Sequence, residues 1–431
     1  MLTLKNNFLE KIGANHGLSP AEIEKVKPRI REYLRRIRMR NQGFYEIIDE
    51  SDAPYVAFAK SIKGKYESVV VLGIGGSALG TIAIASAMKH LFENELLKKK
   101  TPKLYILDNV DPNLLAEIED VIDCKKTLWI VVTKSGKTPE TLAQFSHFKN
   151  LLEQKKRRIN EHFVIITDKN ADFLRNIAKK EKIPVFDIPE NVGGRFSVLT
   201  AVGLLPSAII GIDTEKFLKG ARNMRDKFFS EKWEENLSFQ IATFQYLLSK
   251  KGKTITVILP YSQKMFRFAD WYRQLLAESI GKAHSLDGKL IHAGLTPVAA
   301  LGVTDQHSQS QLYNEGPNDK FFIFLALANF GLDIKVPACH HHDETVNFLS
   351  GSTFGKLMHV EMDATVKSLT ENKRPSMIIE IDKINPENLG ALFMLFEGSI
   401  AFLGEFLRIN AFDQPGVDRS KELTREMLLE K

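Results

Sequence analysis

The sequence predicts an α/β protein with two parallel-sheet domains, on the basis of three observations. From about residue 66, short β-branched runs alternate with amphipathic segments, as in parallel strands flanked by helices. The same alternation of β-branched runs and amphipathic segments begins again near residue 213, although no exact internal repeat is visible. The length of 431 residues also exceeds that of one ordinary domain.

Four strands are expected in the first of these domains. They are the runs SVVVL (68–72), KLYIL (103–107), LWIVV (128–132) and FVIIT (163–167). Between the last two, the segment TPETLAQFSHFKNLLEQ has the apolar spacing of a helix packed on a sheet. Residues 19–40 precede the first strand, and their pattern predicts a helical N-terminal extension.

The second domain is expected to begin with a long helical stretch and the strand TITVIL (254–259). A helix from about Met265 to Leu276 follows, and SMIIEI (376–381) is a later strand. The final part is helical, and Glu397 and Glu405 within its apolar run favour a packed helix over a membrane span. The expected organisation is an N-terminal helical extension, a first domain, a second domain and C-terminal helices, at 1–42, 43–212, 213–385 and 386–431.

Composition narrows the class of protein. The chain has 59 Lys and Arg against 53 Asp and Glu, and this net charge of +6 is spread along helical segments. We therefore expect no nucleic-acid partner, although a modest basic bias suits an anionic small substrate. Two distant cysteines indicate no disulfide framework, and the N-terminus lacks the apolar core of a signal peptide. A cytoplasmic protein without a membrane partner is expected.

The stretch VVVLGIGGSALG (69–80) resembles the opening of a nucleotide-binding domain, but two nucleotide sites fit poorly. Gly73, Gly75 and Ala78 match the loose dinucleotide pattern, which also needs an acidic residue about twenty positions later. That region is helical, and the next strand ends only at Asp108. A P-loop is excluded because Val131 replaces the first glycine of the pattern that ends in Gly136-Lys137-Thr138.

A compact anion site remains. A glycine turn between a parallel strand and a helix presents backbone N–H groups where the helix dipole favours negative charge, and Ser77 adds a hydroxyl. The strand 128–132 ends in TKSGKTPET, which supplies further hydroxyls and two lysines. Together the two loops predict binding of a phosphate monoester. Taken singly, Ser77 and Thr138 could instead cap helices.

Four further stretches carry a resemblance to a known family. They are NVGGRFSVLTAVGLLP (191–206), LPYSQKMFRFADWYRQLLAESIGK (259–282), GVTDQHSQSQLYNEG (302–316) and FDQPGVDRSK (412–421). In this order they resemble the glucose-6-phosphate isomerase family, and with the two loops the match spans nearly the whole chain. The resemblance implies an α/β fold of two sugar-isomerase (SIS) domains, each a doubly wound parallel sheet with helical N- and C-terminal extensions. It also implies a cytosolic homodimer that uses neither metal nor nucleotide.

Site residues follow from the resemblance, position by position. Those implied to bind substrate, mostly its phosphate, are Gly76, Ser77, Thr133, Lys134, Ser135, Thr138, Glu140, Gln274 and Gln414. Glu278 matches the catalytic base, and Arg195 lies beside the reacting carbons. His307 and Lys421 match the pair that opens the sugar ring, and His307 is implied to reach the site of the neighbouring subunit.

These residue types suit the chemistry. A carboxylate can remove a proton from C2 and return it to C1 on one face of a cis-enediol. A guanidinium stays charged and stabilises the enediolate without exchanging protons. Without their motifs, Glu278, His307 and Lys421 would be ordinary surface residues. The sequence also departs from the family at Asp418, where the signature usually has Glu, and at Gly136, Lys137 and Pro139.

Other interpretations carry less weight. The run CHHHDE (339–344) does not predict a metal site, because three consecutive histidines cannot all face one ion from a regular helix or strand. A non-catalytic SIS-type sensor of phosphosugars would lack the base, and a nicotinamide-dependent oxidoreductase would need the missing acidic residue. An isomerase with broader specificity that includes mannose 6-phosphate stays open.

Overall fold

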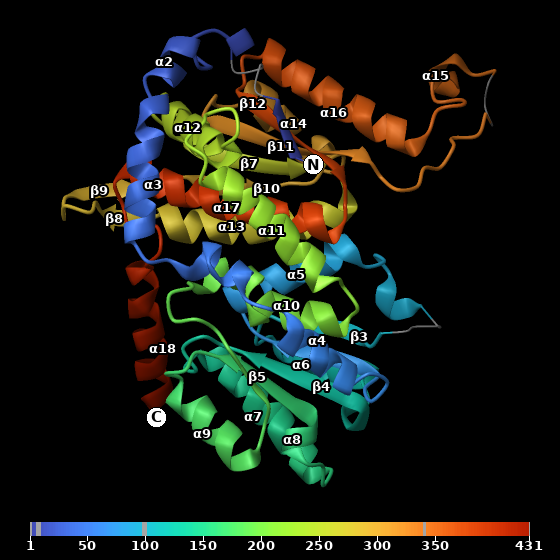
Figure 1. Ribbon diagram of the computed structural model, residues 1–431. Helices are drawn as coiled ribbons and strands as arrows, with labels where there is room; N and C mark the ends of the chain where they lie inside the picture. The colour runs from blue at the N-terminus through green and yellow to red at the C-terminus, as the bar shows by residue number, and fades with distance from the viewer. Residues whose placement is uncertain (1, 6–9, 97–100, 339–341, 431) are drawn as a thin grey trace.

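The computed structural model describes residues 2–5, 10–96, 101–338 and 342–430. Two five-stranded sheets lie one above the other, with helices on both faces of each and between them (Figure 1). Cys339, His340 and His341 of the histidine run lie outside the described residues. The predicted class, α/β with parallel sheets, is confirmed.

The first sheet is entirely parallel. Its strand order is β3-β2-β4-β5-β6, formed by Lys103–Leu107, Ser68–Leu72, Thr127–Val132, Phe163–Thr167 and Val185–Asp187. The four predicted strands all form, and β6 is an addition. The three central strands, β2, β4 and β5, read as almost continuous apolar runs because both of their faces are buried.

Helices cover both faces of the first sheet. One face packs on α6 (Pro112–Val121), α7 (Pro139–Gln154) and α9 (Asp172–Glu181). The other face packs on α4 (Ala53–Ser61) and α10 (Ala201–Ile209). The short helix α8 (Ile159–His162) leads into β5. This is the doubly wound arrangement that the sequence predicts.

The second sheet repeats this order in its parallel strands. Its order is β1-β12-β11-β7-β10, formed by Leu2–Lys5, Ser376–Lys383, Lys320–Asn329, Ile255–Pro260 and Thr296–Ala299. Read from the other edge, β10-β7-β11-β12 has the same succession as β3-β2-β4-β5 in the first sheet. β7, β10, β11 and β12 are parallel, and β1 pairs with β12 in the antiparallel sense. The predicted N-terminal extension is therefore not wholly helical, because residues 2–5 add an edge strand to the second sheet.

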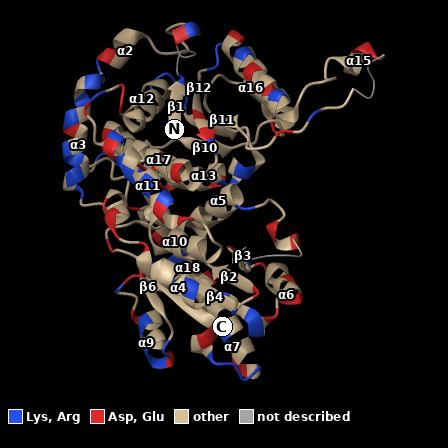
Figure 2. Cartoon of the chain, turned by 45° about the vertical axis from the view of Figure 1, so that its right-hand side comes forward, with Lys and Arg blue, Asp and Glu red and all other residues tan. Residues whose placement is uncertain are grey.

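The predicted helical stretch before β7 and the predicted helix after β7 both form, and three further helices were not predicted. The helices of this part of the chain are α11 (Thr214–Phe228), α12 (Leu237–Ser249), α13 (Phe266–Ile280), α14 (Gln306–Glu315), α15 (Glu344–Asn347) and α16 (Phe354–Glu371). Of these, α15 lies on a segment that projects away from the sheet (Figure 1). A hairpin of β8 (Lys282–His284) and β9 (Leu290–Ala293) follows α13 directly. The N-terminal region contributes α2 (Pro20–Glu24) and α3 (Ile30–Met39), as predicted for residues 19–40. Lys and Arg residues lie along α3 at the outside, whereas the strands are largely free of charge (Figure 2).

The helix α17 (Pro386–Leu407), the longest of the C-terminal part, is at the centre of the largest apolar core. It packs against α11, α12 and α13. By length and hydropathy it is the one described helix that could cross a membrane, but 94% of its apolar window is buried inside the protein. The predicted packed helix is confirmed. Glu405 pairs with Arg40, and burial raises the pKa of the enclosed Glu397 well above its ordinary value.

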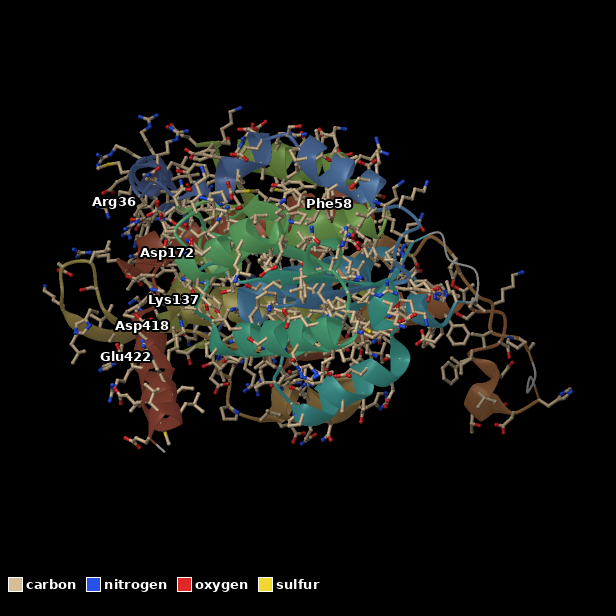
Figure 3. The ribbon with its side chains drawn as sticks, turned by 90° about the horizontal axis from the view of Figure 1, so that it is seen from below. Arg36, Phe58, Lys137, Asp172, Asp418 and Glu422 are labelled. Carbon is tan, nitrogen blue, oxygen red and sulfur yellow. The ribbon has the colours of Figure 1, made fainter. Side chains whose placement is uncertain are left out.

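The chain ends in α18 (Asp418–Leu429), which runs along the outside of the molecule (Figure 3). Asp418 and Glu422 project from it, and none of its residues is buried. The helix nevertheless begins beside the loop 410–417, so its first turns lie at the mouth of the cavity described below.

Candidate active site

The two hydroxyl-bearing loops lie side by side at the carboxyl edge of the first sheet. β2 and β4 are hydrogen-bonded neighbours, so the glycine turn after β2 and the segment after β4 emerge together. The strand order reverses between these two strands, where open α/β sheets bind their ligands. The sequence predicted this juxtaposition, and the structure produces it.

Neither hydroxyl is used as a helix cap. Thr138 occupies the N-cap position of α7, but its side chain makes no capping hydrogen bond. Its Oγ1 lies 2.7 Å from Thr133 Oγ1 instead. Ala78, and not Ser77, is the N-cap residue of α5 (Leu79–Met88). The capping alternative therefore does not describe these loops.

The glycine turn lets two loops touch through their backbones. Gly75 has φ of +58°, a conformation that side chains rarely adopt. A Cβ on Gly76 would lie 2.3 Å from the carbonyl oxygen of Gly194. Only a glycine fits there, so the 3₁₀ turn η4 (Gly75–Ser77) packs directly on η7 (Gly194–Leu199). This contact brings Arg195 next to the two hydroxyl-bearing loops that follow β2 and β4.

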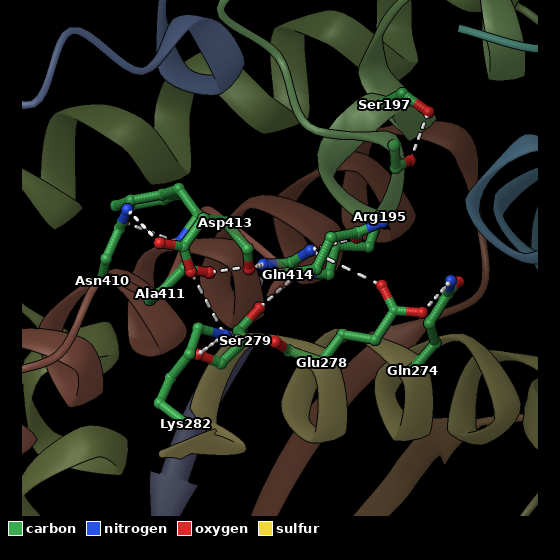
Figure 4. Close-up of polar contacts among 12 residues, drawn as sticks. Arg195, Ser197, Gln274, Glu278, Ser279, Lys282, Asn410, Ala411, Asp413 and Gln414 are labelled. Atoms are coloured by element: carbon green, nitrogen blue, oxygen red, sulfur yellow. Dashed lines mark hydrogen bonds and ion pairs between the residues drawn. The ribbon is translucent and has the colours of Figure 1, made fainter. Parts of the chain in front are cut away.

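Arg195 is a buried hub between three segments (Figure 4). Its Nε donates to Ser279 Oγ at 2.7 Å, and its Nη1 donates to Gln414 Oε1 at 2.9 Å. Its Nη2 donates to the carbonyl oxygens of Ala411 and Asp413, at 2.6 and 3.0 Å. Burial lowers the pKa of this guanidinium, and the carboxylate of Glu278 opposes that shift. With 3% exposure, the side chain is rigidly oriented.

Glu278 faces this arginine from α13, which extends past the predicted end of that helix. One carboxylate oxygen lies 3.5 Å from Arg195 Nη1. The other accepts a hydrogen bond of 3.0 Å from Gln274 Nε2, one turn earlier on the same face. The Glu278 side chain keeps 30% exposure, so it is oriented by partners and still open to a ligand.

These groups line one cavity of about 670 Å³. Of the predicted site residues, it brings together Gly76, Ser77, Lys134, Ser135, Thr138, Arg195, Gln274, Glu278, Gln414 and Lys421. The hydroxyl-bearing loops and the Arg195–Glu278 pair thus line the same cavity, and Lys421 lines it from α18.

Three predicted residues are not on the cavity lining. Thr133 is buried behind Thr138 and contacts it through the hydroxyl pair. Glu140 lies in the first turn of α7. His307 is exposed on α14 and lies outside the cavity of its own chain. Within one chain, the structure therefore assembles the predicted base and Lys421 but not the histidine.

The predicted Lys134 and two residues that were not predicted, Ser279 and Lys282, lie around the Arg195–Glu278 pair and the hydroxyl-bearing loops. Lys134 donates to the carbonyl oxygens of Glu190 and Val192, at 2.7 and 2.9 Å, and burial lowers its pKa. Ser279 and Lys282 were missed, although both stand in the motif that carries Glu278. Their position in the same motif as Glu278 was the only feature of the sequence that could have identified them, because the sequence does not show which residues of the motif are buried.

Known proteins match this chain over nearly its whole length. The family model described as phosphoglucose isomerase matches residues 19–431. A glucose-6-phosphate isomerase of Carboxydothermus hydrogenoformans is 40% identical over 98% of this chain and 93% of its own length. One of Methanocaldococcus jannaschii is 36% identical over 88% of both chains.

Solved structures share the whole fold. A hypothetical protein of Thermus thermophilus superposes with a TM-score of 0.88, at 31% identity over 100% of both chains. A glucose-6-phosphate isomerase of Chlamydia trachomatis superposes with a TM-score of 0.82, covering 99% of this chain and 88% of its own. Its 24% identity supports the fold alone. The two doubly wound SIS-type domains predicted from the sequence are confirmed, and with the family model matching nearly end to end, the chain belongs to the phosphoglucose isomerase family.

Proposed function

We propose that this enzyme interconverts glucose 6-phosphate and fructose 6-phosphate. The observation that carries the proposal is the placement of Glu278 beside Arg195 in the cavity that the hydroxyl loops also line. One part of the cavity suits a phosphate and another suits proton transfer with a developing negative charge. A phosphosugar sensor would have no use for the second part.

The phosphate-binding part consists of the turn at Gly76 and Ser77 and the segment from Lys134 to Thr138. Backbone N–H groups, hydroxyls and a lysine can together satisfy the oxygens of a phosphate monoester. This binding lies away from the reacting carbons, so its energy is available to align them with Glu278.

The isomerisation itself needs a base, an anion-stabilising group and a ring opener. Glu278 takes the C2 proton and returns it to C1, and Arg195 stabilises the enediolate between the two steps. Lys421, together with His307, opens the sugar ring before proton transfer. The test is purified enzyme with fructose 6-phosphate, without added metal or cofactor, in which glucose 6-phosphate should accumulate. No formation of glucose 6-phosphate would reject the proposal.

We expect activity to survive exhaustive chelation and to need no nucleotide. Both nucleotide patterns fail in the sequence, and among the described residues no cluster of three or more His, Cys, Asp or Glu could hold a metal ion. The measurement compares turnover before and after incubation with a strong chelator. Activity that disappears and returns with a divalent metal would contradict this metal-free mechanism.

We also propose a cytoplasmic homodimer in which His307 serves the site of the neighbouring subunit. The support is that His307 is exposed and lies outside its own chain's cavity, while Glu278 and Arg195 are paired within one chain. A second copy would then supply the missing member of the ring-opening pair.

Mixed dimers test this sharing. Glu278→Gln and His307→Ala subunits, each nearly inactive alone, are unfolded together and refolded. In a mixed dimer, one site collects both lesions and the other collects neither. About half of the dimers are mixed, so roughly a quarter of wild-type activity should return.

The matched control pairs Glu278→Gln with Arg195→Ala. Both groups belong to the site of one subunit, so every site keeps a lesion and no activity should return. If mixed dimers of the first pair, verified with two affinity tags, stay as inactive as this control, His307 serves its own subunit.

A further inference from the structure

Lys282 is a buried lysine one helical turn after Glu278. It stands where α13 ends and β8 begins, and its side chain is only 6% exposed. It does not line the cavity, and none of the roles above uses it. A buried ammonium group is costly unless partners compensate it, so its contacts need an explanation.

The first set of contacts fixes the last turn of α13. Lys282 Nζ donates to the carbonyl oxygen of Glu278 at 2.6 Å and to that of Ser279 at 3.0 Å. The last carbonyls of a helix lack intrahelical donors, and the negative end of the helix dipole favours a cation there. The backbone of the proposed base is therefore held directly by this ammonium group.

The second contact joins that turn to the loop that carries Gln414. Asp413 Oδ1 lies 3.8 Å from Lys282 Nζ, and the Asp413 carbonyl oxygen accepts from Arg195 (Figure 4). Two cations from different segments thus hold the same loop. Arg195 also donates to Ser279, so the helix turn and the loop are cross-linked from both sides.

The ammonium group of Lys282 loses its proton at a lower pH than that of an ordinary lysine. Burial is the main cause that lowers its pKa to about 8, and the charge of Arg195 acts in the same direction. Asp413 and Glu278 oppose the shift. The ammonium form therefore prevails below about pH 8 and is lost above it, whereas an ordinary lysine, with a pKa of 10.5, stays charged well above that pH.

We propose that Lys282 is a positioning residue for the isomerisation, which clamps the turn bearing Glu278 against the 411–414 loop. This inference rests on the proposed function, in which Glu278 moves the proton. A shift of a reacting group by about 1 Å can cost on the order of 10² in rate. The clamp acts on the carboxylate through its own backbone and leaves the phosphate loops untouched.

The experiment compares Lys282→Met, Lys282→Arg and a matched control, Lys253→Met. Lys253 is also buried, donates to the Oδ1 atom of Asn318 at 2.6 Å, and precedes the amino end of β7, opposite the edge at which strands lead to the site. We expect Lys282→Met to lower kcat by about 10²-fold with little change in KM. Lys253→Met should lose thermal stability but keep its kcat.

The pH profile separates positioning from general stability. In the wild type, kcat should decline as the pH passes about 8, because Lys282 loses its proton there. Arginine keeps its charge at this pH, so Lys282→Arg should retain part of the rate and move the decline to higher pH. Wild-type kcat and profile in Lys282→Met, or losses in both methionine variants that merely follow their melting temperatures, would overturn the proposal.

A readout without catalysis distinguishes this inference from the proposed function. Backbone hydrogen exchange should accelerate in 276–282 and 410–414 in Lys282→Met, and not in Lys253→Met. Faster exchange in Lys282→Met, combined with a wild-type enzyme that fails to isomerise fructose 6-phosphate, would leave the clamp in place and reject the function. Unchanged exchange in both segments would reject the clamp.

Discussion

Replacing Glu278 with Gln should lower kcat by at least about 10²-fold. The amide keeps the shape and can still accept the hydrogen bond from Gln274, but it cannot accept the C2 proton. It also removes the negative charge that faces Arg195 at 3.5 Å. The measurements are kcat and KM for both sugar phosphates, together with the affinity for a phosphorylated enediolate mimic.

Affinity for that mimic should fall far less than kcat, because the phosphate loops are unchanged. Glu153→Gln is the matched control, since Glu153 is an exposed glutamate that pairs with Lys149 on α7, away from the cavity. It should behave like the wild type. If Glu278→Gln raises KM and preserves kcat, Glu278 orients the substrate and another group is the base.

The second large effect is expected for Ser77→Ala combined with Thr138→Val. Each lost hydrogen bond to a charged acceptor is worth roughly 1.5–3 kcal/mol. Together the changes should weaken binding of the phosphorylated substrate by roughly 10²- to 10⁴-fold, at about 1.4 kcal/mol for each factor of ten. The measurements are KM for fructose 6-phosphate and the dissociation constant of inorganic phosphate.

Thr138→Ser is the control for this pair. It keeps a hydroxyl that can reach the phosphate and Thr133, so most of the affinity should remain. The melting temperature of the double variant reports any loss of fold from the broken hydroxyl pair. An intact protein whose KM barely changes would mean that the loop is a structural turn and that the phosphate binds elsewhere.

Six of the twelve described strands and several of the helices could be predicted because their signals are local. The apolar runs of β2, β4 and β5 are buried on both faces, which makes each of them recognisable without its neighbours. The helix that carries Glu278 was predicted too, although it continues for about one turn past the expected end near Leu276. Helix ends depend on capping contacts, and here the last carbonyls are bound by Lys282.

Strand β1 illustrates what local patterns cannot supply. Its four residues are too short to indicate a strand, and they form one only because β12 offers an open edge. For α17 the helix itself was predicted, but its partners were not: it packs in a core made by helices from earlier parts of the chain. In both cases the partner is remote in the sequence, so the pairing is a property of the assembled fold.

By itself, the sequence determined the fold class, the family, the two hydroxyl loops and the identity of Glu278 and Arg195 as candidate catalytic groups. Motif residues and periodic apolar runs are short-range features, so they survive in the linear chain. The tertiary structure decided which of these groups meet. It made Arg195 a hub between three segments, placed Lys282 beneath Glu278 and left His307 outside the cavity of its own chain. Such contacts join residues that are far apart in the sequence, and their geometry exists only after the two sheets and the helices between them have packed.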